Sequence, residues 1–258
     1  MEKSIFAVDA FVGKSILISG GTSGIGAAAA EIFLACGACV VLMGRDEQRG
    51  HGALAALAAG ERARFIAGDV CVAADCAHAV EEAVRAFGGV DVLVNSAGIY
   101  AEGALDDLTE ETLDELIATN IKGTFRLTQA ALPPLRAACG TIVNVASDAG
   151  LHGNYFCAAY AATKGAVIAF TRSLALELAH DHVRVNAVAP ADVLTPLTEQ
   201  QFSPYLPRTE QLREMAAHYP LHWNARGSRR RDRISCVTCG CVGDGEYLHG
   251  RRRADSVV

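Results

Sequence analysis

Short aliphatic and β-branched runs alternate along most of the chain with longer alanine-rich stretches whose apolar residues recur at helical spacing. The short runs are apolar at successive positions, as in Val40-Val41-Leu42, which is typical of parallel strands covered by helices on both faces. The pattern predicts strands at residues 15–19, 38–43, 64–67, 90–95, 141–146 and 183–188, and helices at residues 24–36, 47–59, 73–87, 110–138 and 158–179. We therefore expect a doubly wound, parallel α/β sheet.

Length and composition suit one folded domain. The chain has 258 residues, 51% of them hydrophobic, which excludes a disordered or collagen-like protein. Charges such as Glu31, Arg45 and Glu177 interrupt the apolar stretches before the roughly 18 residues of a membrane-spanning helix, and residues 1–10 lack a signal-peptide core. Nine irregularly placed cysteines do not suggest a disulfide framework. We expect a cytoplasmic protein whose cysteines are mostly buried thiols.

The charge is unevenly distributed along the chain. Residues 1–225 carry 15 basic and 25 acidic side chains, a net charge of −10, whereas residues 226–258 carry 8 basic and 4 acidic ones, a net charge of +4. We therefore divide the chain into an α/β domain at residues 1–225 and an atypical basic, cysteine-containing tail at residues 226–258.

A glycine-rich loop follows the first predicted strand and opens the first helix. Three glycines at this spacing permit a tight turn and a close approach of the backbone to a pyrophosphate, which the positive helix N-terminus attracts. An ordinary turn is the alternative, but the strand-loop-helix context favours nucleotide binding. The candidate binding residues are Gly20, Thr22, Ser23, Gly24, Ile25 and Gly26.

The end of the second strand bears on the choice of cofactor. An NAD-binding protein usually has a carboxylate here for the ribose hydroxyls, whereas this chain has Gly44 followed by Arg45. A guanidinium can pair with the 2′-phosphate of NADP(H), so Arg45 favours NADP(H), with NAD(H) still possible. Alternatively, Arg45 is a solvated loop charge and Asp46 only caps the next helix.

Candidate catalytic residues lie in the second half of the domain. Tyr160 and Lys164 are four residues apart and so share one helix face, where the ammonium favours the phenolate that proton exchange at neutral pH needs. Ser147 follows the strand at residues 141–146, where strand ends meet the ligand crevice. Asn120 lies in the preceding long helix.

With these motifs in order, residues 12–222 resemble a classical short-chain dehydrogenase/reductase, whose fold is Rossmann-like. The resemblance rests on the glycine loop, Asp69-Val70, Asn95-Ser96-Ala97-Gly98, Asn120, Ser147, Tyr160 and Lys164. It implies that Asp69 and Val70 flank the adenine and that Asn95, Ala97 and Gly98 line the cofactor side of the sheet. The chain departs from the family where Ser96 replaces an Asn and where Ala191 replaces the Gly after Pro190, beside the nicotinamide.

The resemblance also implies a mechanism, in which hydride passes between the nicotinamide and a ketone or secondary alcohol. Tyr160 is then the general acid or base, and Ser147 holds the substrate oxygen. Lys164 lowers the pKa of Tyr160 and binds the nicotinamide ribose, and Asn120 positions a water in a proton relay. Thr195 resembles the threonine that contacts the carboxamide.

The substrate itself is not specified. The segments that would form the pocket and its lid are residues 151–157 and 197–219. Within the first, His152 is either a further catalytic group or, as we favour, a pocket-wall or solvated residue. These residue types suit a modest ketone or secondary alcohol.

The tail has Arg runs at residues 229–233 and 251–253 and cysteines at 236, 239 and 241. A nucleic-acid patch, a metal site and a partner-binding extension are competing interpretations. The Arg runs lack interleaved aromatics and the cysteines lack a second pair, although His249 can contribute. We expect neither nucleic acid nor metal as a ligand, and the acidic domain argues against a nucleic-acid function for the whole chain.

A frameshift is our leading hypothesis for this tail, with an evolved extension as the alternative. The family's last helix usually opens with Pro-Glu-Glu and its last strand contains Thr-Gly, and neither appears here. Reading plausible codons one base later restores both near residues 225 and 249. We then expect residues 227–258 to pack poorly and the chain to form a homodimer rather than the family's common tetramer. An alternative function is cofactor binding with little or no turnover.

Overall fold

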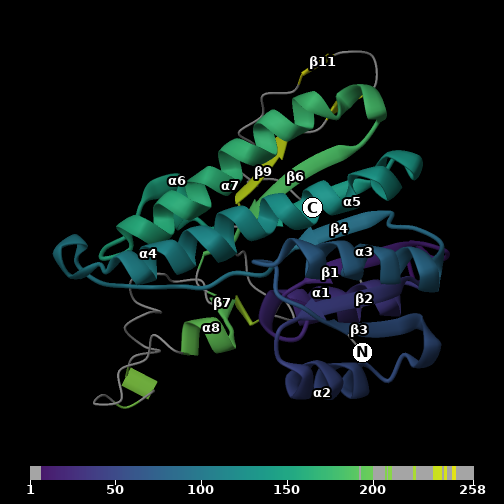
Figure 1. The fold of residues 1–258 in the computed structure, drawn as a ribbon, viewed down its shortest axis with the longest axis horizontal. Helices are drawn as coiled ribbons and strands as arrows, with labels where there is room; N and C mark the ends of the chain where they lie inside the picture. The colour runs from purple at the N-terminus through teal and green to yellow at the C-terminus, as the bar shows by residue number, and fades with distance from the viewer. Residues whose placement is uncertain are drawn as a thin grey trace.

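A twisted sheet forms the centre of the molecule (Figure 1). The computed structural model describes residues 7–191, 193–199, 207, 209–210, 223–224, 235–239, 241–242 and 246–247. Among these residues the sheet has the strand order β3-β2-β1-β4-β5-β6-β9, and its first six members are parallel. They are β1 Ser15–Ser19, β2 Cys39–Gly44, β3 Ala63–Ala67, β4 Val92–Asn95, β5 Thr141–Val145 and β6 Arg184–Ala189. The predicted doubly wound sheet is confirmed.

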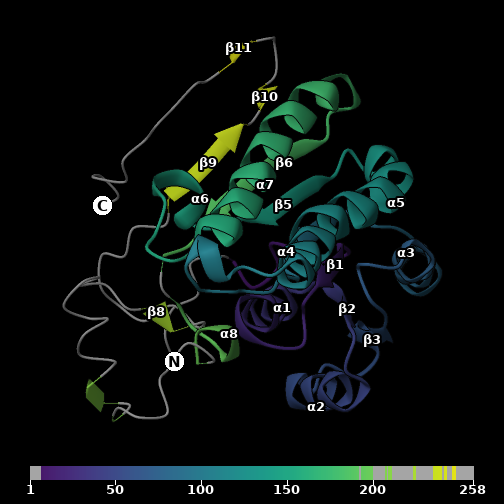
Figure 2. The same ribbon diagram turned by 60° about the vertical axis from the view of Figure 1, so that its left-hand side comes forward.

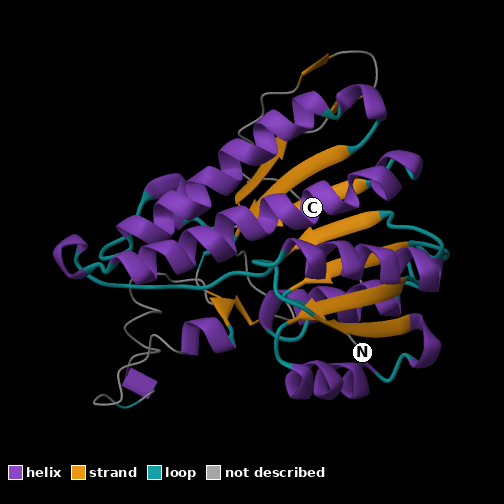
Figure 3. Cartoon of the chain, in the orientation of Figure 1, coloured by secondary structure: helices purple, strands orange, loops and turns teal. Residues whose placement is uncertain are grey.

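Helices alternate with these strands and cover both faces of the sheet (Figures 2 and 3). Alternate β1 residues show the two faces, since Leu17 belongs to the apolar cluster that includes α3, α5 and α7 residues, while Ile16 and Ile18 belong to the cluster with α1 and α2 residues. No described helix is long and apolar enough to cross a membrane. The α-helices are α1 Gly24–Ala35, α2 Glu47–Leu57, α3 Ala73–Phe87, α4 Glu110–Leu116, α5 Thr124–Ala137, α6 Ala149–His152, α7 Ala158–Glu177 and α8 Pro196–Glu199.

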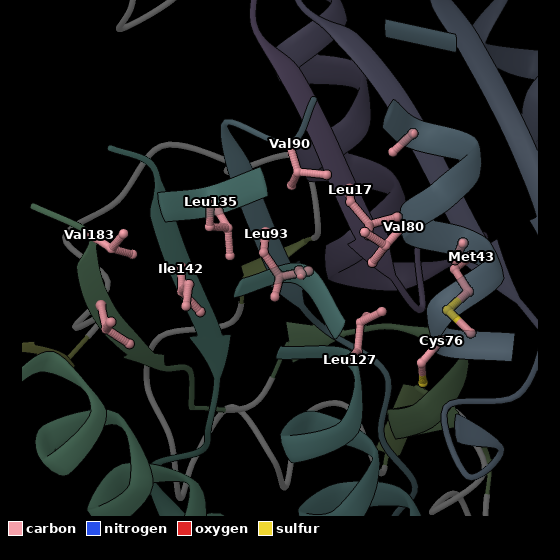
Figure 4. Packing of buried hydrophobic residues seen from close by; sticks show 14 of the residues in the cluster. Leu17, Met43, Cys76, Val80, Val90, Leu93, Leu127, Leu135, Ile142 and Val183 are labelled. Atoms are coloured by element: carbon pink, nitrogen blue, oxygen red, sulfur yellow. The ribbon is translucent and has the colours of Figure 1, made fainter. Parts of the chain in front are cut away.

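The larger apolar cluster lies between the sheet and the α3, α5 and α7 layer (Figure 4). Leu17, Leu93 and Ile142 from three adjacent strands are fully buried, as are Leu127 and Leu135 from α5. Each such side chain stabilises the fold by about 1.5–3 kcal/mol relative to exposure. This core holds the carboxyl ends of the central strands, where the candidate residues lie, in fixed relative positions.

The helix predicted at residues 110–138 is interrupted at its centre. Between α4 and α5 the chain forms the π-helical turn η3, Ile117–Gly123. The Thr124 hydroxyl donates to the carbonyl oxygen of Asn120 at 2.9 Å, and a Cβ on Gly123 would lie 2.6 Å from Val70 Cγ2. Such π-turns occur often at functional sites, and apolar periodicity alone did not reveal this one.

The seventh strand of the sheet comes from the tail. β9, Ser235–Cys239, pairs antiparallel with β6, so this stretch has backbone partners despite the predicted poor packing. Residues 225–234, 240, 243–245 and 248–258 lie outside the described residues, so the prediction for the tail as a whole stays a prediction. Two short strand pairings complete the description: β7 Val193–Leu194 pairs with β8 Trp223–Asn224, and β10 Cys241–Val242 pairs with β11 Glu246–Tyr247.

Candidate active site

The loop between β1 and α1 is so tightly packed that its glycines leave no room for a side chain. Gly20 has a φ of +64°, and a Cβ on it would lie 2.8 Å from the Ala97 nitrogen and Cα. A Cβ on Gly26 would lie 2.4 Å from the carbonyl oxygen of Gly20. Because real Cβ atoms do not approach backbone this closely, glycine is required at both positions. The close packing lets α1 begin directly beside the carboxyl end of β1.

The N-terminus of α1 can receive an anion. Ser23 is the N-cap residue, but its side chain makes no capping hydrogen bond. The first N–H groups of a helix have no partner within the helix and carry partial positive charge. Ser23, Gly24 and Ile25 all line the cleft described below. The residues present therefore fit the pyrophosphate of a nicotinamide dinucleotide.

Lys164 is buried next to Tyr160 on α7. Its Nζ atom donates to the carbonyl oxygen of Val145 at 2.8 Å and lies 5.8 Å from the centre of the Tyr160 ring. Burial lowers the pKa of Lys164 to about 8, because a low-dielectric environment disfavours the ammonium. At neutral pH most of the lysine is still charged, so it can favour the Tyr160 phenolate.

Ser147, in the loop after β5, and Tyr160, on α7, face the same cleft. Each is only 8% exposed. The Ser147 hydroxyl donates to Asp148 Oδ1 and its Oγ accepts from the Ala149 N–H, both at 3.2 Å. The Tyr160 ring packs edge-on against Tyr100, with ring centres 4.8 Å apart. The two predicted catalytic side chains thus have defined orientations.

Asn120 is held in η3 by hydrogen bonds to two neighbouring segments. Its Oδ1 accepts from the Ile99 N–H at 2.8 Å, and its Nδ2 donates to the Ile99 carbonyl at 3.0 Å and to Thr163 Oγ1 at 3.1 Å. A Cβ on Gly98 would lie 3.2 Å from Asn120 Oδ1 and 3.5 Å from Lys164 Nζ. Asn120 therefore joins the loop after β4 to α7 and lies next to the lysine.

One cleft of about 210 Å³ brings most of the predicted residues together. Its lining includes the predicted residues Gly20, Ser23, Gly24, Ile25, Ala97, Gly98, Ser147, Tyr160, Lys164, Pro190 and Thr195. Gly24 approaches Thr195 so closely that a Cβ on it would lie 3.3 Å from the threonine side chain. The cleft does not include Thr22, Gly26, Arg45, Asp69, Val70, Asn95 and Asn120 among its lining residues.

Arg45 and Asp69 lie together at the predicted adenine end. Arg45 forms an ion pair with Asp69, with Nη1 and Oδ2 3.7 Å apart. Asp69 Oδ1 also accepts from the Cys71 N–H at 2.8 Å, whereas Val70 is buried against Gly123. The side chain assigned to a 2′-phosphate therefore already has an anionic partner in the structure.

Asn95 is buried and is not among the residues that line the cleft, and its place on the cofactor side of the sheet stays a prediction. Its buried Nδ2 donates to Thr128 Oγ1 at 2.9 Å and to Asn144 Oδ1 at 2.8 Å. Asn144 in turn donates to Thr171 Oγ1 at 2.9 Å. This chain of hydrogen bonds ties β4 and β5 to α5 and α7, which gives Asn95 a part in joining the sheet to its helices.

Sequence reasoning missed Tyr100 and Asp148, which both line the cleft. The Tyr100 hydroxyl donates to Glu102 Oε2 at 3.0 Å and lies 2.9 Å from Cys157 Sγ. Burial, reinforced by the Cys157 contact, raises the pKa of Tyr100 well above its ordinary range. Their closeness in sequence to Gly98 and Ser147 is the only signal that pointed to them.

The predicted pocket and lid segments contribute only in part. Asn154, Leu197 and Thr198 line the cleft, whereas His152 is exposed and is not among the lining residues, as expected of a solvated residue. Residues 200–206, 208 and 211–222, most of which belong to the predicted lid, lie outside the described residues.

Comparison with known proteins identifies the family. Residues 14–205 match the model of the short chain dehydrogenase family. The chain is 38% identical over 195 residues to the L-fucose dehydrogenase of Mus musculus, covering 75% of this chain and 70% of that protein.

Two solved structures are also similar. A 3-ketoacyl-(acyl-carrier-protein) reductase from Brucella melitensis complexed with NADH has a TM-score of 0.75 at 30% identity, covering 83% of this chain and 87% of that one. A variant of the actinorhodin polyketide ketoreductase with NADPH has a TM-score of 0.78 at 32% identity, covering 86% and 88%. With its cleft, its glycine loop and these relatives, the chain belongs to the short-chain dehydrogenase/reductase family of oxidoreductases.

Proposed function

We propose that this protein transfers hydride between NADP(H) and a ketone or secondary alcohol, with Tyr160 as general acid and base. The observation that carries the proposal is that Ser147, Tyr160 and Lys164 line the same cleft as the α1 glycine loop. When bound, the nicotinamide cofactor supplies the hydride chemistry. The protein then has to bind the cofactor, orient the substrate oxygen and move one proton.

The side chains divide this work. Tyr160 gives its proton to the substrate oxygen in reduction and takes it back in oxidation, and Ser147 holds that oxygen by a hydrogen bond. Lys164 uses one of its three donors on Val145, which leaves two for the ribose hydroxyls. Asn120 holds a water in the proton relay beside Lys164, and Thr195 contacts the carboxamide.

Preference for NADP(H) is the finer part of the proposal. One related structure holds NADH and another holds NADPH, so both cofactors occur among the relatives of this chain. Two residues favour NADP(H). Gly44 stands where a carboxylate is usual, and Arg45 follows directly after β2 and is largely exposed. Exchange of Asp69 for the 2′-phosphate would give Arg45 a more highly charged partner.

Cofactor binding without turnover is the alternative. It is favoured by the sheet edge, where β9 runs antiparallel to β6 and where Val188 of β6 is only half-buried. Titration of NADPH fluorescence, followed by an assay of NADPH oxidation with a panel of ketones, separates the two. Binding with turnover supports the oxidoreductase, binding without turnover supports the alternative, and no binding contradicts both.

We further propose a cytoplasmic homodimer formed through α5 and α7. Phe125 on α5 stacks on Phe170 on α7 with ring centres 3.9 Å apart. Phe125 is 44% exposed and Leu176 on α7 is 56% exposed. A second copy related by a twofold axis would cover this apolar surface.

A further inference from the structure

Asp148 places a carboxylate in the cleft wall directly beside Ser147. Its N–H donates to the Pro190 carbonyl at 3.0 Å, and its own carbonyl accepts from the N–H groups of Leu151 and His152 at 2.8 and 2.9 Å. The backbone on both sides is therefore fixed. Asp148 is half-buried and is one of the residues that line the cleft.

The Ser147 hydroxyl has one proton, and two acceptors compete for it. In the structure the proton goes to Asp148 Oδ1 at 3.2 Å, while the Ala149 N–H donates to the same hydroxyl oxygen. If Ser147 turns its proton to a substrate oxygen, Asp148 loses this donor. An anionic acceptor that loses a donor in a half-buried site is costly unless another donor replaces it.

We propose that this cleft selects neutral substrates with a hydroxyl on the carbon next to the reacting one, that is, vicinal diols in oxidation and α-hydroxy ketones in reduction. The inference rests on the proposed function. The second hydroxyl donates to Asp148 while Ser147 donates to the reacting oxygen. The two substrate oxygens lie about one hydrogen-bond length apart, about 2.8 Å, which matches the 3.2 Å between Ser147 Oγ and Asp148 Oδ1.

The reaction itself remains a two-electron oxidation of one carbinol. Its C–H bond breaks as hydride passes to the oxidised nicotinamide, its O–H proton passes to the phenolate of Tyr160, and a C=O bond forms. The neighbouring hydroxyl changes neither its oxidation state nor its bonds to carbon. Asp148 is therefore a specificity residue rather than a proton carrier.

The charges around the cleft also argue against an anionic substrate. Lys164 is the only cation among the described lining residues, and its Nζ donates to the Val145 carbonyl and lies 5.8 Å from the centre of the Tyr160 ring. Tyr100, which lines the cleft, donates to a second carboxylate, that of Glu102. A 2-hydroxy acid would place its own carboxylate against Asp148 without a cationic partner.

Three alcohols of similar size test the inference: butane-2,3-diol, butan-2-ol and lactate, each oxidised with NADP⁺ and with NAD⁺. We expect kcat/KM for the diol to exceed that for butan-2-ol by about 10- to 100-fold, the range given by one hydrogen bond to a charged group. Lactate should be the poorest substrate. Asp148→Asn should reduce the preference for the diol to less than about threefold and raise lactate turnover about tenfold.

Glu61→Gln is the matched control. It removes one exposed carboxylate just before the amino end of β3, whereas the cleft lies at the carboxyl ends of the strands. It should leave all three ratios unchanged. Equal turnover of the diol and butan-2-ol by the wild-type protein would overturn this inference alone, and requires no variant to fold. Absence of turnover of every alcohol and of the ketone panel would instead overturn the proposed function, and this inference with it.

Discussion

The ammonium of Lys164 lies 5.8 Å from the centre of the Tyr160 ring and is anchored to the Val145 carbonyl. The anchor comes from the last residue of β5, and Tyr160 and Lys164 lie one turn apart on α7. The relationship between the two side chains is therefore set by the packing of α7 on the sheet. A cation held at this position favours the phenolate without pairing with it directly.

Tyr160→Phe should abolish most turnover and leave cofactor affinity nearly unchanged, because it removes only the hydroxyl. General acid-base catalysis contributes about 10²- to 10⁴-fold, so kcat should fall by that range. Steady-state kinetics and NADPH fluorescence titration measure the two effects. Tyr155→Phe, at a residue 88% exposed, is the control. Activity within about tenfold of wild type would contradict the assigned role of Tyr160.

The contribution of Lys164 to the stability of the cofactor-free protein should rise with pH above about 8. The pKa of Lys164 is about 8 in the folded chain and 10.5 ordinarily. Between these values the unfolded chain binds more protons, so the free energy of unfolding increases with pH, by about 3 kcal/mol in total. Below pH 8 both states are protonated and the contribution is flat.

Urea unfolding of the wild-type protein and of Lys164→Met at pH 7 and pH 9.5 measures this dependence. The free energy of unfolding of the wild type, relative to that of Lys164→Met, should be larger at pH 9.5 than at pH 7. The same difference at both values would show that the Lys164 pKa is not lowered by burial.

Arg45→Ala should weaken NADPH binding by about tenfold or more, since it removes a charge-assisted contact to the 2′-phosphate. NADH binding should change by less than about twofold. Arg49→Ala is the control, because Arg49 is also exposed and pairs with Asp46. Equal losses for both cofactors, or tighter NADH than NADPH binding by the wild type, would contradict the assignment.

Gly26→Ala should prevent cofactor binding and destabilise the fold, because its Cβ would lie 2.4 Å from the Gly20 carbonyl oxygen. Gly52→Ala on α2 is the matched control, since a Cβ there meets nothing within 4 Å. That change should be neutral or raise the stability by up to about 1 kcal/mol through helix propensity. Thermal unfolding and NADPH titration of the two variants test both statements.

Phe125→Asp should convert the proposed dimer to monomers, because it places a charge in the apolar surface over α5 and α7. Light scattering of the wild type and the variant measures the change. Arg85→Asp is the control, because it introduces an aspartate at an exposed position on α3, outside the proposed interface. It should leave the oligomeric state unchanged. A wild-type protein that is a stable tetramer would contradict the dimer and the frameshift hypothesis on which it rests.

Several features were readable from the sequence because they depend on local periodicity. The strands at residues 15–19 and 141–145 and the helix at residues 73–87 lie where apolar runs and helical spacing predicted them. The spacing of Gly20, Gly24 and Gly26 predicted a close-packed turn, and one helical turn between Tyr160 and Lys164 predicted their common face. These patterns extend over a few residues and do not depend on contacts with distant segments of the chain.

Other features arise only when distant segments meet. Asn95 belongs to a motif that suggested a cofactor contact, and in the structure its amide donates hydrogen bonds to Thr128 and Asn144. The π-turn at Asn120 depends on packing against Val70 and Ile99.

The sequence by itself determined the alternation of elements, the close-packed glycine loop and the common helix face of Tyr160 and Lys164, because each depends on backbone geometry within one element and its flanking turn. Only the tertiary structure decided that Arg45 meets Asp69, that Tyr100 packs on Tyr160 and that Asp148 lines the cleft with its carboxylate bonded to Ser147. Such contacts depend on where the strand ends lie relative to one another and on which donors and acceptors come within hydrogen-bonding distance there. Hydrogen bonds and ion pairs are short-ranged and directional, so their partners are settled only when the chain has folded.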